Sequence, residues 1–146
     1  IKHHSIYYLN KKNDAWYFMP TTYSKEHNSF NTSALSGEVF ALIKEENPPV
    51  ISGLSPQFGK TLNSRDLNYL SFNIKDDLAG IDGENDVLIK INNHKVIHEY
   101  NSYRKEVKYF LNEKLIQGNN NINIILKDRA GNIKELNGQL IFNSNK

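Results

Sequence analysis

The sequence predicts an all-β protein in which a β-sandwich follows a smaller, partial sheet. Apolar residues alternate with polar ones with a period of two, and no stretch repeats them at the spacing of a helix. Turn-forming pairs such as Asp82-Gly83, Asn92-Asn93 and Asn137-Gly138 separate the alternating stretches. Many short strands joined by polar turns are typical of packed sheets rather than of a helical or α/β fold.

The expected strands lie on both sides of a double proline. Before it, we expect up to four strands, at Ser5–Leu9, Ala15–Met19, Ser29–Ala34 and Gly37–Lys44. After it, the clearest alternation is found in Leu70–Lys75, Val87–Ile91, Val107–Leu111 and Ile122–Leu126. The one expected helical piece is a single turn around Asn112–Gln117.

The double proline, Pro48-Pro49, predicts a boundary between two units. Two consecutive prolines cannot both take part in a strand ladder, and they favour a stiff, extended connection. We therefore expect one unit at residues 1–46 and a second at 47–146. The second unit, at about 100 residues, has the size of a seven-stranded immunoglobulin-like sandwich. The first is too small to be comfortably stable alone, so it is either the C-terminal part of a preceding β-sandwich, which we favour, or a set of strands lying on the second unit.

Two turns of the second unit can be predicted in more detail. Gly80 and Gly131 each follow an acidic residue after a strand, where a turn needs a positive φ that glycine adopts freely. Asp128 is placed to accept backbone N–H bonds across the turn that ends at Asn132. These residues have structural roles in the prediction.

The composition excludes several classes of function. The chain has 146 residues, 38% hydrophobic and 23% charged, with a formal net charge of +2, so it can form a core but lacks the basic field of a nucleic-acid binder. Apolar runs such as Val39–Ile43 are far shorter than the ~20 residues of a membrane span. The absence of cysteine excludes disulfides, thiolate zinc sites and cysteine nucleophiles. Because the chain starts at Ile1 without a Met, we interpret it as a fragment or a processed product.

The order of several short motifs in the second unit resembles a known module. Pro48-Pro49-Val50-Ile51 is followed by Asp76-Asp77-Leu78-Ala79-Gly80-Ile81, by a hairpin at Asn92-Asn93, by Tyr100 and Gly118, and by Asp128-Arg129-Ala130-Gly131-Asn132. This order is similar to that of bacterial Ig-like (fibronectin/immunoglobulin-type) β-sandwich modules, with Ala79 in place of the family's serine and Asn92-Asn93 in place of its Asp-Gly turn.

The resemblance extends to the residues before the double proline and implies a context for the module. Trp16-Tyr17-Phe18 and Gly37–Leu42 resemble the non-catalytic C-terminal region of large exported cell-envelope proteins, some of which are lysostaphin-type zinc peptidases that cut peptidoglycan. The implied role is a non-catalytic spacer, positioning or binding module, at a periplasmic, cell-surface or secreted location. Its implied partners are the other domains of the same polypeptide, and a cell-wall glycan or another envelope protein.

No catalytic constellation can be recognised, so we expect no enzymatic activity. The sequence has no His-x-His pair, no nucleophile elbow and no phosphate-binding glycine loop. His94 and His98 have the i, i+4 spacing of helical zinc ligands, but on the strand expected here they lie ~13 Å apart. Solvent-exposed positions in a hairpin explain both histidines better.

An acidic cluster offers the ligands that Ca²⁺ prefers. Five carboxylates lie close together in a glycine-containing loop, and a sixth at the end of a neighbouring strand can join them: Asp76, Asp77, Asp82, Glu84, Asp86 and Asp128. Their spacing is not that of an EF-hand. The alternative is a solvated polar loop, and we expect no cofactor other than this possible Ca²⁺.

Aromatic residues before the double proline suggest a second kind of site. Tyr7, Trp16 and Tyr17 can form a flat platform that stacks on sugar rings. Alternation along a strand sends half of such residues inward, so core packing is the competing explanation. Two rivals to the spacer role therefore remain: a carbohydrate-binding module that anchors a peptidoglycan-cleaving enzyme, and an interface subunit of a surface assembly whose unpaired edge strand recruits a partner.

Overall fold

A computed structural model describes residues 1–34, 36, 39–111 and 114–144, and the fold is all-β as predicted. In chain order the strands are β1 (His4–Asn10), β2 (Ala15–Phe18), β3 (Thr22–Ser24), β4 (Ser29–Asn31), β5 (Val39–Lys44), β6 (Val50–Ser55), β7 (Thr61–Leu62), β8 (Tyr69–Lys75), β9 (Val87–Ile91), β10 (His94–Val96), β11 (Glu99–Asn101), β12 (Glu106–Phe110), β13 (Gly118–Lys127) and β14 (Ile133–Phe142). A short 3₁₀ turn, η1, covers Glu84–Asp86.

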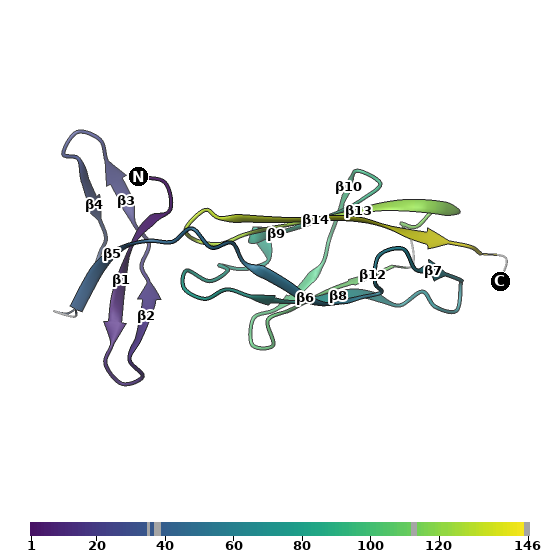
Figure 1. Cartoon of the computed structure of the whole chain (residues 1–146), viewed down its shortest axis with the longest axis horizontal. Helices are drawn as coiled ribbons and strands as arrows, with labels where there is room; N and C mark the ends of the chain where they lie inside the picture. The colour runs from purple at the N-terminus through teal and green to yellow at the C-terminus, as the bar shows by residue number, and fades with distance from the viewer. Residues whose placement is uncertain (35, 37–38, 112–113, 145–146) are drawn as a thin grey trace.

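The strands after the double proline form a sandwich of two sheets. One sheet has the order β10-β9-β13-β14-β7 and the other β11-β12-β8-β6. Neighbouring strands are antiparallel, except β7, which runs parallel to β14. Figure 1 shows the two sheets lying face to face along the long axis of the molecule. This is the predicted Ig-like β-sandwich, with short additional strands such as β7.

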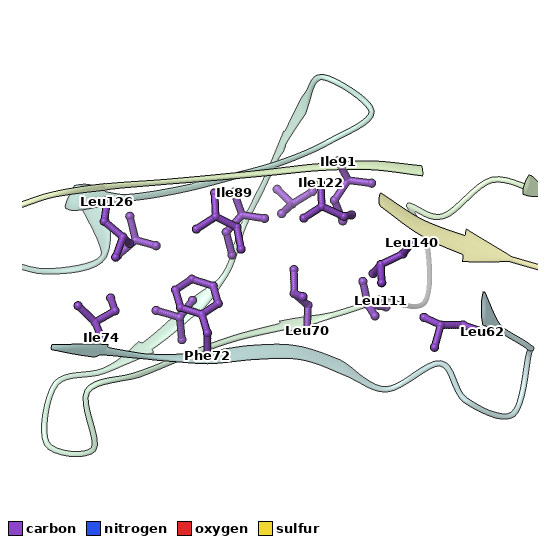
Figure 2. Packing of buried hydrophobic residues seen from close by; sticks show 14 residues of the cluster. Leu62, Leu70, Phe72, Ile74, Ile89, Ile91, Leu111, Ile122, Leu126 and Leu140 are labelled. Carbon is purple, nitrogen blue, oxygen red and sulfur yellow. The ribbon is translucent and has the colours of Figure 1, made fainter. Parts of the chain in front are cut away.

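Side chains from the two sheets interdigitate in one continuous core. Leu70, Phe72 and Ile74 alternate along β8 and point toward Ile89 and other residues of the opposite sheet (Figure 2). Each of these side chains is at most 4% exposed. The apolar residues of the alternating stretches are therefore the ones on the buried face of the sheet.

The strands before the double proline form a separate three-stranded sheet of order β2-β1-β5, which we call the N-terminal sheet. A small hairpin, β3-β4, precedes β5. Figure 1 shows the N-terminal sheet at one end of the elongated sandwich, with the C-terminus at the other end. Strand β3 was not expected, and residues 37–38 of the predicted Gly37–Lys44 strand lie outside the described residues. The division into independent units at residues 46 and 47 stays a prediction.

The predicted helical turn at Asn112–Gln117 falls partly on residues 112–113, which lie outside the described residues. Residues 114–117 form turn and irregular structure, not a helix. The described residues contain no helix with the length and hydrophobicity needed to cross a membrane.

Gly138 provides a test of the packing, because it lies on β14 directly beneath the ring of Phe58. A Cβ at position 138 would overlap Cδ2 and Cγ of the Phe58 ring. We expect Gly138→Ala to lower the free energy of unfolding by about 1–3 kcal/mol, since overpacking forces the ring to move. Urea unfolding measures this change.

Two further variants serve as controls for that experiment. In a Phe58→Ala background, Gly138→Ala should cost much less, because the clashing ring is gone. Gly83 has an extended backbone (φ 170), and a Cβ added to it would meet no atom within 4 Å. Gly83→Ala should therefore change the stability by no more than about 0.5 kcal/mol. An equal loss at positions 83 and 138 contradicts the packing argument.

Candidate functional site

Three carboxylates meet where the N-terminal sheet contacts the end of the sandwich. Glu45 follows β5, Asp76 follows β8 and Asp128 follows β13. One carboxylate oxygen from each lies within 4.8 Å of the other two. Glu45 is only 5% exposed and Asp128 only 1%, whereas Asp76 is half-buried. We call these three residues the acidic triad.

The Glu45 carboxylate joins the N-terminal sheet to the sandwich through hydrogen bonds. Its Oε2 atom accepts a bond of 3.1 Å from the hydroxyl of Tyr7 on β1. The same atom accepts a bond of 3.0 Å from the backbone N–H of Ala79, in the loop after β8. One buried oxygen therefore holds groups from both sides of the junction.

The other two members of the triad organise turns of the sandwich. Asp128 accepts bonds from the backbone N–H of Asn132 at 2.8 Å and from its side-chain amide at 2.9 Å. That amide also donates to the backbone carbonyl of Glu45 at 3.0 Å. Asp76 accepts the backbone N–H of Gly80 at 2.5 Å. The predicted cap at Asp128 is thus present, and Gly80 has the predicted positive φ of 74.

One more side-chain contact crosses the junction, since the ring Nδ1 of His3 lies 3.1 Å from the carbonyl oxygen of Ala130. The backbone N–H of Glu45 donates to the carbonyl of His3 at 2.9 Å, which extends the pairing of β1 with β5. Tyr7, Ala79 and Ala130 form a small buried cluster, with Trp16, Phe18, Ile43 and Leu78 packed against it. The junction is therefore an apolar contact with a charged, hydrogen-bonded centre.

Burial of this centre is electrostatically unfavourable at neutral pH. Burial, and then the charge of Asp76, raise the pKa of Glu45 above its ordinary value. Burial also raises the pKa of Asp76, and the charge of Asp128 adds to that effect. No ion pair links a triad residue to a lysine or arginine in the described part of the chain. Two unit charges 4.8 Å apart repel by about 3–4 kcal/mol at an effective dielectric constant of about 20.

The structure divides the six acidic residues predicted from the sequence. Asp76 and Asp128 lie in the triad, but Asp77 is exposed and pairs with Lys75, at 3.9 Å. Asp82 is paired with Arg129 at 3.2 Å. Asp86 accepts the backbone N–H of Asp82 at 2.9 Å. Glu84 is exposed in the η1 turn, so the six do not form one ligand set.

Glu45, the third member of the triad, was missed by the sequence analysis. The sequence places it at the end of the first unit, just before the double proline and beside the exposed Glu46. A usable signal was present, because strand alternation continues through Ala41 and Ile43 and places residue 45 on the same inward face as Tyr7.

The three aromatic residues proposed for glycan stacking do not form one platform. Tyr7 is completely buried and donates to Glu45. Trp16 is half-buried in the junction cluster. Tyr17 is 41% exposed on the opposite face of the sheet, where it stacks on Tyr8 with ring centroids 5.4 Å apart. Alternation along β1 and β2 explains this separation, which corrects the sequence-based grouping.

The two histidines considered as zinc ligands are also accounted for. His94 is exposed on β10, as expected. His98, in the connection from β10 to β11, is half-buried and both its ring nitrogens are shielded from solvent, which corrects the expected exposed position. Burial lowers the pKa of His98. Neither histidine belongs to the group of three potential ligands found among the described residues.

Comparison with known proteins identifies the fold but no family. No protein-family model matches the chain, and no curated protein matches it. CopC from Methylosinus trichosporium OB3b is similar in structure, with a TM-score of 0.52 and 12% identity, over 67% of this chain and 96% of CopC. The fibronectin(III)-like modules of Clostridium thermocellum CbhA give a TM-score of 0.44 at 12% identity; the match covers 88% of this chain and 62% of theirs. At these identities the comparison with CopC shows the β-sandwich fold alone.

The raised pKa of Glu45 predicts how the junction responds to pH. The ordinary pKa of an unfolded glutamate is about 4.3. Because the folded-state pKa is higher, ionisation destabilises the folded state above that folded-state pKa, and this cost disappears as the pH falls to the unfolded value. Glu45→Gln keeps an oxygen for Tyr7 and Ala79 but removes the charge. With EDTA present, we expect the Tm of Glu45→Gln minus that of the wild type to be largest at pH 7 and to shrink toward pH 4.5.

A second variant separates the charge of Glu45 from its hydrogen bonds. Glu45→Ala leaves the Tyr7 hydroxyl and the Ala79 N–H without their acceptor, which costs about 1–3 kcal/mol for each buried group. Its Tm should lie below that of Glu45→Gln at every pH. A difference between Glu45→Gln and the wild type that is constant from pH 4.5 to 7 contradicts the assignment.

Proposed function

We propose that this chain is a non-catalytic positioning module of an exported bacterial envelope or surface protein. The observation that carries the proposal is the buried junction at Glu45, which fixes the N-terminal sheet on one end of the sandwich. Its bonds reach Tyr7 on one side and Ala79 and Asn132 on the other. The resemblance of residues 47–146 to bacterial Ig-like modules supports the exported location and the role as one part of a longer polypeptide.

The linker supports the same role. The connection is short, since β5 ends at Lys44 and β6 begins at Val50, and Pro49 within it is buried. A proline pair has few accessible backbone conformations, so it adds stiffness to the hydrogen-bonded contact. A module built in this way transmits a fixed orientation rather than acting as a flexible tether.

The triad supports a second proposal, that the junction binds Ca²⁺. Oxygens within 4.8 Å of one another can share an ion whose bonds to oxygen are ~2.4 Å long. Three carboxylates, two of them almost fully buried and without a cationic side chain as partner in the described residues, need either a proton or a cation. Ca²⁺ suits such an irregular set of oxygens better than Mg²⁺, which requires a near-ideal octahedron.

The carbohydrate-binding rival has weaker support, because Tyr7 and Tyr17 lie on opposite faces of the N-terminal sheet. The single tryptophan, Trp16, is close enough to both to report on binding. A fluorescence titration with peptidoglycan fragments that saturates would favour this rival over the positioning role.

The positioning role predicts a fixed geometry that depends on Glu45. In small-angle X-ray scattering, we expect the wild type to fit a single compact arrangement of the N-terminal sheet and the sandwich. Glu45→Ala with His3→Ala should raise the radius of gyration and the maximum dimension, because the side-chain contacts of Glu45 with Ala79 and of His3 with Ala130 are lost. Glu46→Ala is the matched control, since Glu46 is exposed and pairs with Lys44, at 2.6 Å. Equal profiles for wild type and double variant argue against a rigid junction.

The cation proposal predicts a Ca²⁺-dependent Tm. Binding to the native state alone contributes about 2.7 kcal/mol at a hundredfold excess over Kd, or about 5–10 °C for a chain of this size. The shift should be lost in the double variant Glu45→Gln, Asp76→Asn. It should persist in Asp82→Ala, Asp86→Ala, which alters acidic residues outside the triad. Identical melting curves in millimolar Ca²⁺ and in EDTA reject the cation but leave the positioning role standing.

A further inference from the structure

Strand β5 is an open edge of the N-terminal sheet. The sheet order is β2-β1-β5, so β5 pairs with β1 on one side, and no other described strand pairs with it on the other. Figure 1 shows β5 at the margin of this sheet, away from the sandwich. Its outer backbone N–H and C=O groups are therefore available to a further strand.

The other edges of the described sheets carry features that disfavour pairing, and β5 does not. β7 has two residues, β3, β4, β10 and β11 have three each, and β2 has four. β14 pairs with β7 only through Ile141 and Phe142, and its open stretch carries the charged Lys134 and Glu135. β6 is as long as β5, with six residues, but a bulge interrupts it between Ser52 and Ser55. Bulges and short lengths are the usual protection of natural edge strands. β5 is regular over its whole length, and its Val39, Phe40 and Leu42 are 44%, 38% and 50% exposed.

We propose that β5 pairs with β5 of a second copy of this chain, antiparallel and with the two-fold axis at Ala41. In this register Phe40 of each copy is opposite Leu42 of the other, and Val39 is opposite Ile43. The strand is therefore self-complementary in hydrophobicity, which suits a symmetric dimer. Moving the axis to Leu42 sets Lys44 opposite Phe40 and loses this match.

The proposed pairing also continues an apolar surface already present within one copy. Phe40 is opposite Tyr8 on β1, and Tyr8 stacks on Tyr17 of β2. Leu42 is opposite Ile6 in the same register. All of these side chains lie on the face turned away from the junction cluster. Joining two β5 strands makes this face continuous across both sheets, so the side chains at the new seam gain cross-strand partners.

Sedimentation equilibrium from micromolar to millimolar concentration tests the proposal. The wild type should approach twice the chain mass of 16.8 kDa at high concentration. Phe40→Lys with Leu42→Lys should weaken the dimer by at least about tenfold, because four lysines then face one another across the seam. Ile133→Lys on β14 is the control, since Ile133 is 60% exposed and lies outside the N-terminal sheet. Circular dichroism should show the same β content for all three proteins.

Cysteine crosslinking tests the register, because the natural chain has no cysteine. Directly opposite residues have Cα atoms ~4.5–5.5 Å apart, within the range of a disulfide. Oxidised Ala41→Cys should therefore form a crosslinked dimer, whereas Lys44→Cys should not, because the two copies of residue 44 are ~20 Å apart. A wild type that stays monomeric at millimolar concentration, or a dimer that survives Phe40→Lys with Leu42→Lys, overturns the proposal.

Discussion

The burial of the Glu45 carboxylate is the interaction on which the arrangement of the whole chain depends. Its side-chain oxygen accepts hydrogen bonds from the Tyr7 hydroxyl in the N-terminal sheet and from the Ala79 N–H in the loop after β8. Its backbone carbonyl accepts one from the side-chain amide of Asn132, in the turn between β13 and β14. Segments far apart in the sequence thus converge on one residue. The hydrophobic cluster between the two sheets of the sandwich, by contrast, does not include Glu45.

This interaction combines a structural gain with an electrostatic cost. The hydrogen bonds are the structural gain, because a buried Tyr7 hydroxyl or Ala79 N–H without an acceptor would lower the stability of the folded state. The charge itself is unfavourable, because Asp76 and Asp128 lie beside it in a poorly solvated place. The raised pKa of Glu45 makes the junction sensitive to protons, and the proposed Ca²⁺ site would make it sensitive to cations as well.

Most of the sandwich could be predicted from the sequence, but only part of the junction could. Alternation identified the inward residues of β8 and β13 because each strand has one buried face, and the Asp128 cap followed from local turn chemistry. The triad could not be found in the same way. Its members come from three connections that are distant in sequence. Closeness in sequence instead suggests that Asp76 belongs with Asp82 and Asp86. In the folded chain Asp82 forms an ion pair with Arg129, with Oδ1 of Asp82 at 3.2 Å from Nη2 of Arg129.

The two faces of the N-terminal sheet differ in how they are covered. A three-stranded sheet has no interior of its own, and among the described residues its inward face packs on the end of the sandwich, whereas Tyr17, Phe40 and Leu42 on its outer face are exposed. The hydrogen bonds of Glu45 hold the inward face to the sandwich. β5 ends at Lys44, directly before Glu45, so the strand that carries the exposed Val39, Phe40 and Leu42 also leads into the junction. One short strand therefore joins the buried junction to the exposed edge.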